Sequence, residues 1–301
     1  MGTIMSKISE MLQKIKRKID VEVKSKLKIM TYKDTIRYII DNNASVARYG
    51  DGEFKLMVDG ESLRFQPYSD ELRAALTKVI AERPEHLLVC ISRALMDVNT
   101  SKEYNERSKE FWKKWRWFHL PETVRYIRSC GAGSYVFGDT LITRPYIDYV
   151  KCDRAEVSFK MLREIWNGRD VLIVEGNETR LGIGNDLFDN VSSIKRIITP
   201  NKDAFSVYDK ILQSVKNNYN GELVLLALGP TATVLASDLC REGIRAIDVG
   251  HIDIEYEWYL IQADDKTQIE GKYVNEVHDA YDVQACTDEK YLAQIIDEIH
   301  K

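Results

Sequence analysis

The sequence contains few cysteines, few prolines and no long hydrophobic run. Its 301 residues include 5 cysteines, none of them in a CxxC pair, and 6 prolines. An odd number of scattered cysteines argues against a disulfide framework and against a structural zinc site, and it favours a reducing compartment. No stretch reaches the roughly 20 apolar residues that a membrane-spanning helix needs, and the start shows no secretory signal. We therefore expect a cytoplasmic protein.

Neither sign of charge dominates the chain. The 43 Lys and Arg residues and 47 Asp and Glu residues give a formal net charge of -4, so a general nucleic-acid-binding surface is not expected. With 44% hydrophobic residues, the composition is that of an ordinary globular protein that can bury a large core. No repeat, low-complexity tract or Pro/Gly-rich linker divides the chain after residue 30, so residues 31–301 are predicted to form one domain.

Residues 1–30 differ from the rest of the chain because basic residues outnumber acidic ones there. Apolar residues recur at helical spacing, which predicts a basic amphipathic helix. One interpretation is that this helix packs on the domain or pairs with a second copy of the chain. The other is that it lies on an anionic membrane at the inner face of the plasma membrane. The apolar residues are Ile4, Ile8, Met11, Leu12, Ile15 and Ile19.

Beyond this segment, predicted strands and helices alternate. Some strands are continuous apolar runs, which is typical of strands covered on both faces in a parallel sheet. The pattern predicts a Rossmann-like, doubly wound α/β fold with a mostly parallel sheet, in which ligands bind at the carboxyl ends of the strands. The predicted strands are 45–48, 87–92, 134–137, 170–174, 194–198, 222–228 and 244–249, and the predicted helices are 33–42, 70–82, 102–117, 154–166, 204–217, 231–241 and 288–300.

The first candidate site is the segment ARYGDGEF (47–54), at the end of the first predicted strand. Gly50 permits a tight turn and a close approach of the backbone to a ligand. Asp51 and Glu53 present two carboxylates, and Arg48 precedes them. Mg²⁺ and Mn²⁺ prefer such oxygen ligands, often together with substrate phosphates. The alternative is an ordinary turn whose acids are solvated.

Two further loops follow predicted strands and could bind phosphate. In the glycine-rich segment 174–187, free backbone N–H groups and an arginine can hold phosphate oxygens, although a long loop that caps a helix is the alternative. In LGPTAT (228–233), small residues leave room at a helix start, which is also plain helix-initiation chemistry. The residues predicted to bind a ligand here are Arg180, Gly182, Gly184, Asn185, Asp186, Gly229 and Pro230.

The segment DVGHIDIEYEW (248–258) carries the most titratable groups. His251, Asp253, Glu255 and Glu257 alternate with apolar residues, so an extended chain would place all four on one face. In a helix, residues four apart would be neighbours instead. Either arrangement offers a general base or a metal ligand beside a core strand. The alternative is an edge strand with a solvated polar face and no catalytic role.

Two smaller features complete the candidates. Arg144, in the segment TRPY (143–146), could meet a phosphate or a sugar. An aromatic group at residues 111–118 could stack on sugar rings, but its spacing is more typical of a helix that buries aromatic side chains in the core. Its members are Phe111, Trp112, Trp115, Trp117 and Phe118.

Taken in order, the motifs RYGDGEF, TRPY, EGNETRLGIGNDLF, LALGPTA and DVGHIDIEYEW resemble the GT-D-type glycosyltransferases, a bacterial family first catalogued as a domain of unknown function. The resemblance spans roughly residues 36–258. It implies a Rossmann-like domain, a UDP-sugar donor and a divalent cation, in proteins that build surface glycans, including adhesin glycans and capsule-type polysaccharides. The family's Asp-x-Glu element matches Asp51-Gly52-Glu53, which implies that these carboxylates act at the metal–diphosphate end of the donor. The basic segment at residues 1–30 has no place in the family pattern.

We therefore expect a metal-dependent transferase that moves glucose or a related hexose from a UDP-sugar to a glycan or glycoprotein acceptor, with no nucleic-acid partner. Mn²⁺ or Mg²⁺ would be held by Asp51 and Glu53, with the donor held by arginines and glycine backbone. Asp253 is the first choice for the general base, with Glu255 and His251 as alternatives. A phosphohydrolase or phosphotransferase using the same acids, or a non-catalytic nucleotide-sugar-binding module, is the rival interpretation. The residues assigned to the donor are Arg48, Gly50, Arg144, Arg180, Gly182, Gly184, Asn185, Asp186, Gly229 and Pro230.

Overall fold

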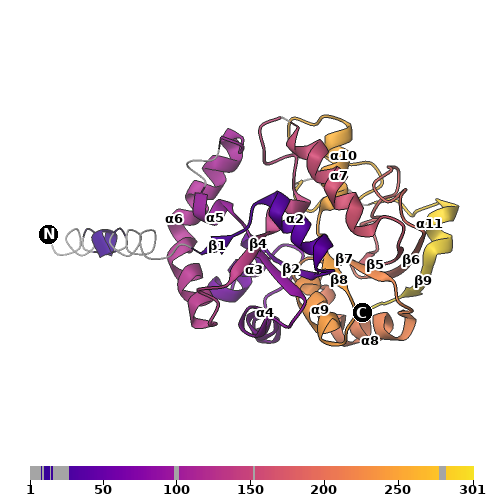
Figure 1. Cartoon of the computed structure of the whole chain (residues 1–301), viewed down its shortest axis with the longest axis horizontal. Coiled ribbons are helices and arrows are strands. Elements are labelled where there is room, and N and C mark those ends of the chain that lie inside the picture. The colour runs from indigo at the N-terminus through magenta and orange to yellow at the C-terminus, as the bar shows by residue number, and fades with distance from the viewer. Residues whose placement is uncertain are drawn as a thin grey trace.

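The computed structural model describes residues 27–97, 102–151, 153–277 and 283–301, together with Ile8, residues 10–13 and Ile15. In this part of the chain a nine-stranded sheet runs in the order β1-β4-β3-β2-β8-β7-β5-β6-β9, and every neighbouring pair is parallel (Figure 1). The strands are β1 (Lys28–Ile29), β2 (Ser45–Tyr49), β3 (Leu87–Ile91), β4 (Val136–Asp139), β5 (Asp170–Gly176), β6 (Ser193–Thr199), β7 (Leu223–Ala227), β8 (Ala246–Asp248) and β9 (Ile295–Glu298).

Helices cover both faces of this sheet (Figure 1). On one face, α2 (Tyr32–Asp41), α7 (Arg154–Trp166) and α10 (Ile252–Leu260) share one hydrophobic cluster. On the other face lie α4 (Asp70–Glu82), α8 (Tyr208–Asn218) and α9 (Pro230–Arg241), and α6 (Glu106–Ser129) packs beside α4. Shorter elements are α3 (Asp51–Phe54), a π-helical turn (Lys55–Asp59), α5 (Ala94–Asp97), α11 (Glu289–Gln294) and 3-10 turns at Thr140–Thr143 and Ala204–Val207.

The apolar strand sequences explain this layered arrangement. In β5, Leu172 and Val174 pack in one hydrophobic cluster while Ile173 packs in another on the opposite face. Strand residues alternate between the two faces, so a strand covered by helices on both sides needs apolar residues at every position. The predicted doubly wound α/β fold is confirmed, and all seven predicted strands are present, within a few residues of the predicted bounds.

The C-terminal prediction was wrong. Instead of one helix over residues 288–300, the chain forms the short helix α11 and then strand β9, which pairs with the edge of β6. The apolar spacing is compatible with either element, and pairing with an open sheet edge overrides the weak helical preference of such a short segment. Lys28–Ile29 likewise form β1 rather than the end of the predicted N-terminal helix.

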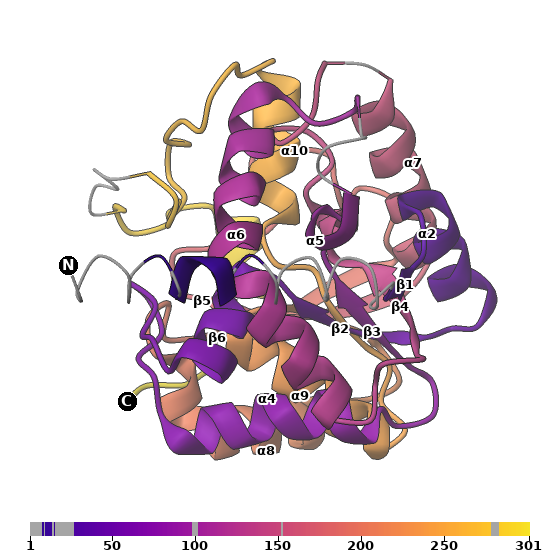
Figure 2. The ribbon, with the colours of Figure 1, turned by 90° about the vertical axis from the view of Figure 1, so that its left-hand side faces the viewer.

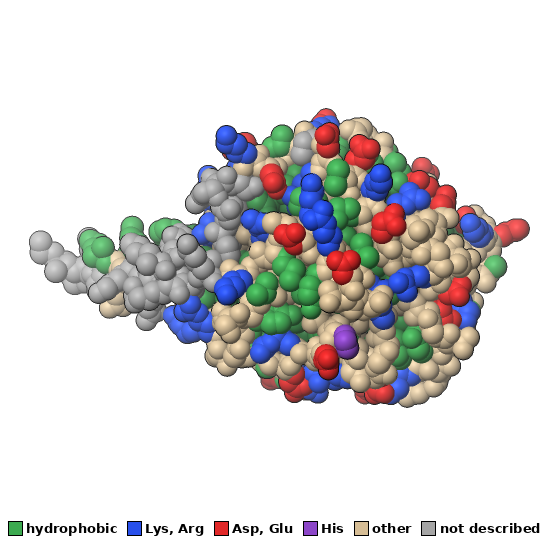
Figure 3. Space-filling model, in the orientation of Figure 1, with side chains coloured by type: hydrophobic (Ala, Val, Ile, Leu, Met, Phe, Trp, Pro, Cys, Tyr) green, Lys and Arg blue, Asp and Glu red, His purple; other side chains and the backbone are tan. Residues whose placement is uncertain are grey.

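The rest of residues 1–30 is largely outside the described residues. The predicted basic helix and the domain boundary at residue 30 therefore remain predictions. Within the described residues, no helix combines the length and the apolar character needed to cross a membrane. On the face drawn in Figure 3, the described acidic and basic side chains are interspersed, in keeping with the small net charge of -4.

The centre of the sheet is a topological switch point. Strands β2 and β8 are neighbours, yet the chain leaves β2 toward α4 on one face and leaves β8 into α10 on the other. Where the chain departs to opposite faces from adjacent parallel strands, a crevice opens at their carboxyl ends. The fold therefore places its ligand-binding crevice beside Tyr49 and Asp248, the last residues of these two strands.

Candidate active site

A cleft of about 840 Å³ lies at the carboxyl edge of the sheet. Its walls come from six strand ends, from the segment 63–66 before α4, from the first turns of α6 and from the segment 265–277 that follows α10. The strand ends contribute Arg48, Gly50, Asp51 and Glu53 after β2, Thr140, Arg144 and Asp148 after β4, Gly176 and Thr179 at β5, Pro200 and Asn201 after β6, Leu228 and Gly229 after β7, and Asp248, Gly250, His251 and Asp253 at β8. The cleft thus coincides with the switch point.

Arg48 is fixed in the cleft wall by three contacts with the ends of two neighbouring strands, β4 and β8. Its guanidinium donates to the carbonyl oxygen of Thr140 at 3.2 Å, to the hydroxyl of Thr143, and to Oδ1 of Asp248 at 3.2 Å. A Cβ on Gly250 would lie 1.8 Å from Nη2 of Arg48, and Gly250 has a φ of +48°. Only glycine permits both that backbone conformation and this close approach.

Asp51 and Glu53 open the short helix α3 at the cleft. Oε2 of Glu53 accepts a hydrogen bond from the backbone N–H of Gly50 at 2.7 Å, which turns this carboxylate back toward the start of the helix. Burial raises the pKa of Glu53 to about 7. The side chain of Asp51 is 39% exposed, and its nearest cation is Lys55 at 3.9 Å. Two acids therefore face one cleft, and Asp51 is held only by a long ion pair to Lys55 among the residues that the structure describes.

These acids fit a divalent ion that a substrate helps to hold. Among the described residues, no group of three or more His, Cys, Asp or Glu side chains could hold a metal ion by itself. Mg²⁺ is commonly bound through one or two carboxylates together with substrate phosphates, and a site completed by the donor needs no third protein acid.

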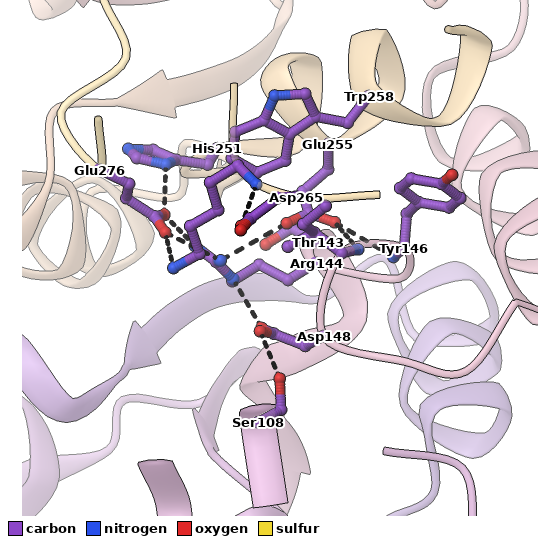
Figure 4. A network of polar contacts seen from close by, with 12 residues as sticks. Ser108, Thr143, Arg144, Tyr146, Asp148, His251, Glu255, Trp258, Asp265 and Glu276 are labelled. Carbon is purple, nitrogen blue, oxygen red and sulfur yellow. Dashed lines mark hydrogen bonds and ion pairs between the residues drawn. The ribbon is translucent and has the colours of Figure 1, made fainter. Parts of the chain in front are cut away.

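Arg144 lines the cleft and is the centre of a charged network (Figure 4). Its guanidinium binds Glu276 through two contacts, and its Nε donates to Oδ2 of Asp148 at 3.2 Å. Nδ1 of His251 lies 3.1 Å from Oε1 of Glu276, and Lys266 also pairs with Glu276. Although burial acts in the opposite direction, Arg144 and His251 hold the pKa of Glu276 well below its usual range.

Glu255 is fully buried beneath this network and does not line the cleft. Its Oε2 accepts hydrogen bonds from the backbone N–H groups of Tyr146 and Ile147, both at 3.1 Å, and its Oε1 lies 3.5 Å from Arg144 (Figure 4). Burial raises the pKa of Glu255 to about 7, against the opposing charge of Arg144. Its contacts make it a positioning residue for Arg144 and for the turn after β4.

Asp253 lines the cleft but has both carboxylate oxygens engaged. Oδ1 accepts hydrogen bonds from the backbone N–H of Gly182 at 2.9 Å and from the amide of Asn185 at 2.8 Å. Oδ2 lies 2.6 Å from Nζ of Lys272, which also binds Glu257 at 2.7 Å. Burial raises the pKa of Asp253, and Lys272 opposes that shift. These contacts tie the glycine-rich loop to α10.

The glycine-rich loop is only partly at the cleft. Gly176, Thr179 and Leu181 line it, whereas the predicted donor-binding residues of this loop do not. Arg180 turns away and donates to the carbonyl oxygens of Gly271, at 2.7 Å, and Gln284. The predicted residues outside the cleft lining are Arg180, Gly182, Gly184, Asn185, Asp186, Pro230 and Glu255, and those that line it are Arg48, Gly50, Asp51, Glu53, Arg144, Gly229, His251 and Asp253.

Sequence reasoning missed the segment 265–277. Lys266, Tyr273 and Glu276 line the cleft, and the segment is anchored by Lys272 and by the backbone hydrogen bond from Tyr273 to the carbonyl oxygen of Glu178 at 2.9 Å. It forms no helix or strand. No periodic pattern or motif marks it, so the sequence alone held no signal for Glu276.

The family comparison decides the assignment. The sequence model described as "Glycosyltransferase GT-D fold" matches residues 46–277, which include every strand end that lines the cleft. This chain belongs to the GT-D family. The resemblance inferred from the motifs is thereby confirmed, and the GT-D match includes the segment 265–277 as well.

Solved GT-D structures agree with the fold. One, described as the highly conserved domain of unknown function 1792 with a distinct glycosyltransferase fold, superposes with a TM-score of 0.83 at 36% identity, covering 95% of this chain and all (100%) of that chain. Another, described as a new glycosyltransferase from Streptococcus sanguinis, gives a TM-score of 0.81 at 36% identity, covering 91% of this chain and 100% of that chain.

Two curated streptococcal proteins are similar in sequence. The probable glycosyl transferase Gly of Streptococcus gordonii is 39% identical over 272 residues, which is 90% of this chain and 38% of that protein. Glycosyltransferase GlyD of Streptococcus pneumoniae serotype 4 is 39% identical over 264 residues, which is 87% of this chain and 31% of that protein. The chain thus spans well under half the length of these relatives.

Proposed function

We propose that this GT-D chain is a metal-dependent glycosyltransferase. It transfers glucose or a related hexose from a UDP-sugar to a glycan or glycoprotein acceptor, in the synthesis of bacterial surface glycans. The observation that carries the proposal is the switch-point cleft, where the half-exposed carboxylate of Asp51 and the fixed guanidinium of Arg48 share one wall. The streptococcal relatives that are named glycosyltransferases support it.

The wall formed by Arg48 and Asp51 suits the diphosphate of the donor. Arg48 is held rigidly by Asp248 and Thr140, so its charge needs no reorganisation when negative charge develops on the leaving group. Asp51 and Glu53 would hold Mn²⁺ or Mg²⁺, which supplies charge neutralisation for a departing diphosphate. Gly229 lines the cleft at the start of α9, where helix N–H groups favour an anion.

His251 is the best placed of the three residues predicted as the general base. Its ring is half-buried, lines the cleft and is oriented by the contact of Nδ1 with Glu276 at 3.1 Å. Asp253 has both oxygens engaged, and Glu255 is buried away from the cleft. A base must reach the acceptor hydroxyl before its pKa matters, and only His251 combines access with a carboxylate that orients it.

The proposal is tested with a panel of UDP-sugars. We expect one UDP-hexose to raise the melting temperature of the full chain when Mn²⁺ is present, and Arg48→Lys to abolish that shift because lysine cannot keep the three-way contact. The same UDP-hexose should be consumed with transfer to an added glycan. Release of free sugar or phosphate without transfer would indicate a hydrolase, and binding without turnover would indicate a binding module.

A separate pair of variants tests the base. His251→Gln should lower the rate of transfer about 10²–10⁴-fold while UDP affinity stays unchanged. Asp253→Asn should instead loosen the glycine-rich loop and weaken donor affinity, because it removes the negative charge that binds Gly182, Asn185 and Lys272. A variant at position 251 that transfers sugar at the normal rate would rule out His251 as the base.

A further inference from the structure

The aromatic side chains on α6 fall into two groups in the structure. Trp112 and Trp115 are only 5% and 4% exposed, and Trp115 stacks in a tilted arrangement against Phe54, with ring centroids 6.3 Å apart. The predicted core role is confirmed for these two. Phe111 is 45% exposed and lines the cleft, whereas Phe118 is 68% exposed and does not. An exposed phenyl ring in a cleft wall requires a different explanation from core packing.

We propose that Phe111 forms a stacking subsite for a sugar ring of the acceptor glycan. This inference rests on the proposed transferase function. A pyranose presents a face of C–H groups, which packs well on an aromatic ring, while its hydroxyls need polar partners at the rim. The Phe111 ring meets Trp112 edge-on, with centroids 5.2 Å apart at 81°, so the buried tryptophan holds the ring in place before a sugar arrives.

Polar partners for hydroxyls lie one helical turn away. Arg107 is four residues before Phe111 on α6, so both side chains lie on the same side of the helix. Arg107 pairs with Asp265 across the cleft mouth, and both residues line the cleft. A guanidinium supplies hydrogen-bond donors and a carboxylate supplies acceptors, and beside an apolar ring they suit the hydroxyls at the edge of a sugar.

The position of Phe111 favours the acceptor over the donor. The donor's diphosphate belongs at the strand ends, beside Arg48 and Asp51, whereas α6 contributes only an outer wall, on the side of the molecule that faces the viewer in Figure 2. A nucleotide sugar is small and can be enclosed. An acceptor glycan continues beyond the enzyme, so its binding site must stay open to solvent, as the exposed Phe111 does.

The test uses the full chain with UDP and Mg²⁺, and titrates three probes by saturation-transfer NMR: methyl β-glucoside, methyl β-galactoside and methyl N-acetyl-β-glucosaminide. For the sugar that binds the wild type, Phe111→Ala should weaken affinity about tenfold, the loss typical of one aromatic stacking partner. Phe111→Trp should restore affinity. Phe118→Ala removes an equally large, more exposed ring from the same helix outside the cleft, and should change affinity by less than about twofold.

Four outcomes would overturn the subsite: no binding of any of the three sugars to the wild type, unchanged affinity in Phe111→Ala, an equal loss in Phe118→Ala, or a loss of UDP affinity with sugar affinity retained. The last result would place the uracil on Phe111. Measuring UDP-sugar turnover in the same preparations separates failure of the subsite from failure of the proposed function. Sugar binding that depends on Phe111 without any transfer would keep the subsite and discard the transferase.

Discussion

The acidic residues of α3 and those of α10 are the most instructive comparison in this molecule. Both groups follow central, adjacent strands of one sheet. From the sequence, both were candidate metal ligands. In α3, the Asp51 side chain is 39% exposed, with its nearest cation 3.9 Å away. In α10, Asp253 and Glu255 are buried, and each has at least three polar contacts at or below 3.5 Å.

The difference arises from how each helix packs. Helix α3 is a single turn at the cleft that begins after Gly50, and its first carboxylate, that of Asp51, reaches solvent. Helix α10 is embedded in a hydrophobic cluster through Ile252, Ile254 and Trp258, and its intervening acids are carried into the protein with them. Buried carboxylates must be paired, so the α10 acids hold neighbouring segments in place while Asp51 of α3 remains available to a ligand.

The largest expected effect tests the structural side of this comparison. Lys272 is buried between Asp253 and Glu257, at 2.6 and 2.7 Å. Lys272→Met leaves the buried carboxylate of Asp253 and the partly buried one of Glu257 without their cation, which should lower the free energy of unfolding by about 3–5 kcal/mol. Urea unfolding measures the loss. Lys151→Met is the matched control, because Lys151 pairs with Asp264 at the surface and should cost at most about 1 kcal/mol. Equal losses in the two variants would contradict a bracing role for Lys272.

The next effect tests the ligand-binding side. Asp51→Asn should reduce transfer from a UDP-sugar about 10²–10³-fold, since a neutral amide is a poor ligand for the cation at the leaving diphosphate. Its stability should stay within about 0.5 kcal/mol of the wild type, because the side chain is half exposed. Asp34→Asn changes an exposed acid in the first turn of α2, far from the cleft lining, and should leave transfer intact. An active Asp51→Asn enzyme would remove Asp51 from the metal site.

A smaller effect is expected at Gly250, which lies just before α10 and close to Arg48, the residue in β2 that precedes α3. Gly250→Ala forces Arg48 to move, since the new Cβ would lie 1.8 Å from Nη2, and donor affinity should fall about tenfold. Gly243→Ala also places a side chain at positive φ, +76°, but meets nothing within 4 Å. It should cost only about 1–2 kcal/mol of stability and no UDP affinity, as measured by calorimetry. Equal UDP affinity in both variants would show that Arg48 does not bind the donor.

Most of the sheet and the position of the cleft could be predicted from the sequence. Strands such as Leu223–Ala227 are continuous apolar runs, which are typical of strands covered on both faces, and parallel strands bring their carboxyl ends to one edge. Gly50, Asp51 and Arg48 were therefore found from local sequence, and they line the cleft. The role of each stays a prediction.

What the sequence could not supply is the partner of each buried charge. Arg144 meets Glu276, 132 residues away, and no local pattern marks that pair. The alternation around Ile254 left strand and helix open, and the structure has a helix. Period-two alternation normally indicates a half-buried strand. Here Asp253 and Glu255 are buried along with the apolar residues, because distant cations pair with them, so the usual contrast between a wet and a dry face is lost.

A further expected effect is a pH dependence that separates two acids of one network. The pKa of Glu255 is raised from 4.5 to about 7, so between these values the folded protein holds a proton that the unfolded chain lacks. Its stability therefore falls as pH rises through this window, by at most about 1.4 kcal/mol per pH unit. Glu255→Gln removes that titration, and unfolding free energies from pH 5 to 7 should fall less steeply in the variant.

Glu276, on the opposite side of Arg144, gives the reverse sign. Its pKa lies well below 4.5, so the stability that it contributes is present above the unfolded value and is lost as pH falls toward the folded one. Glu276→Gln should therefore differ most from the wild type at neutral pH and converge with it in acid. In this interpretation, Arg144 lies between a buried acid that binds a proton, Glu255, and an acid at the cleft that stays ionised, Glu276. Parallel pH profiles for the two variants would contradict that interpretation.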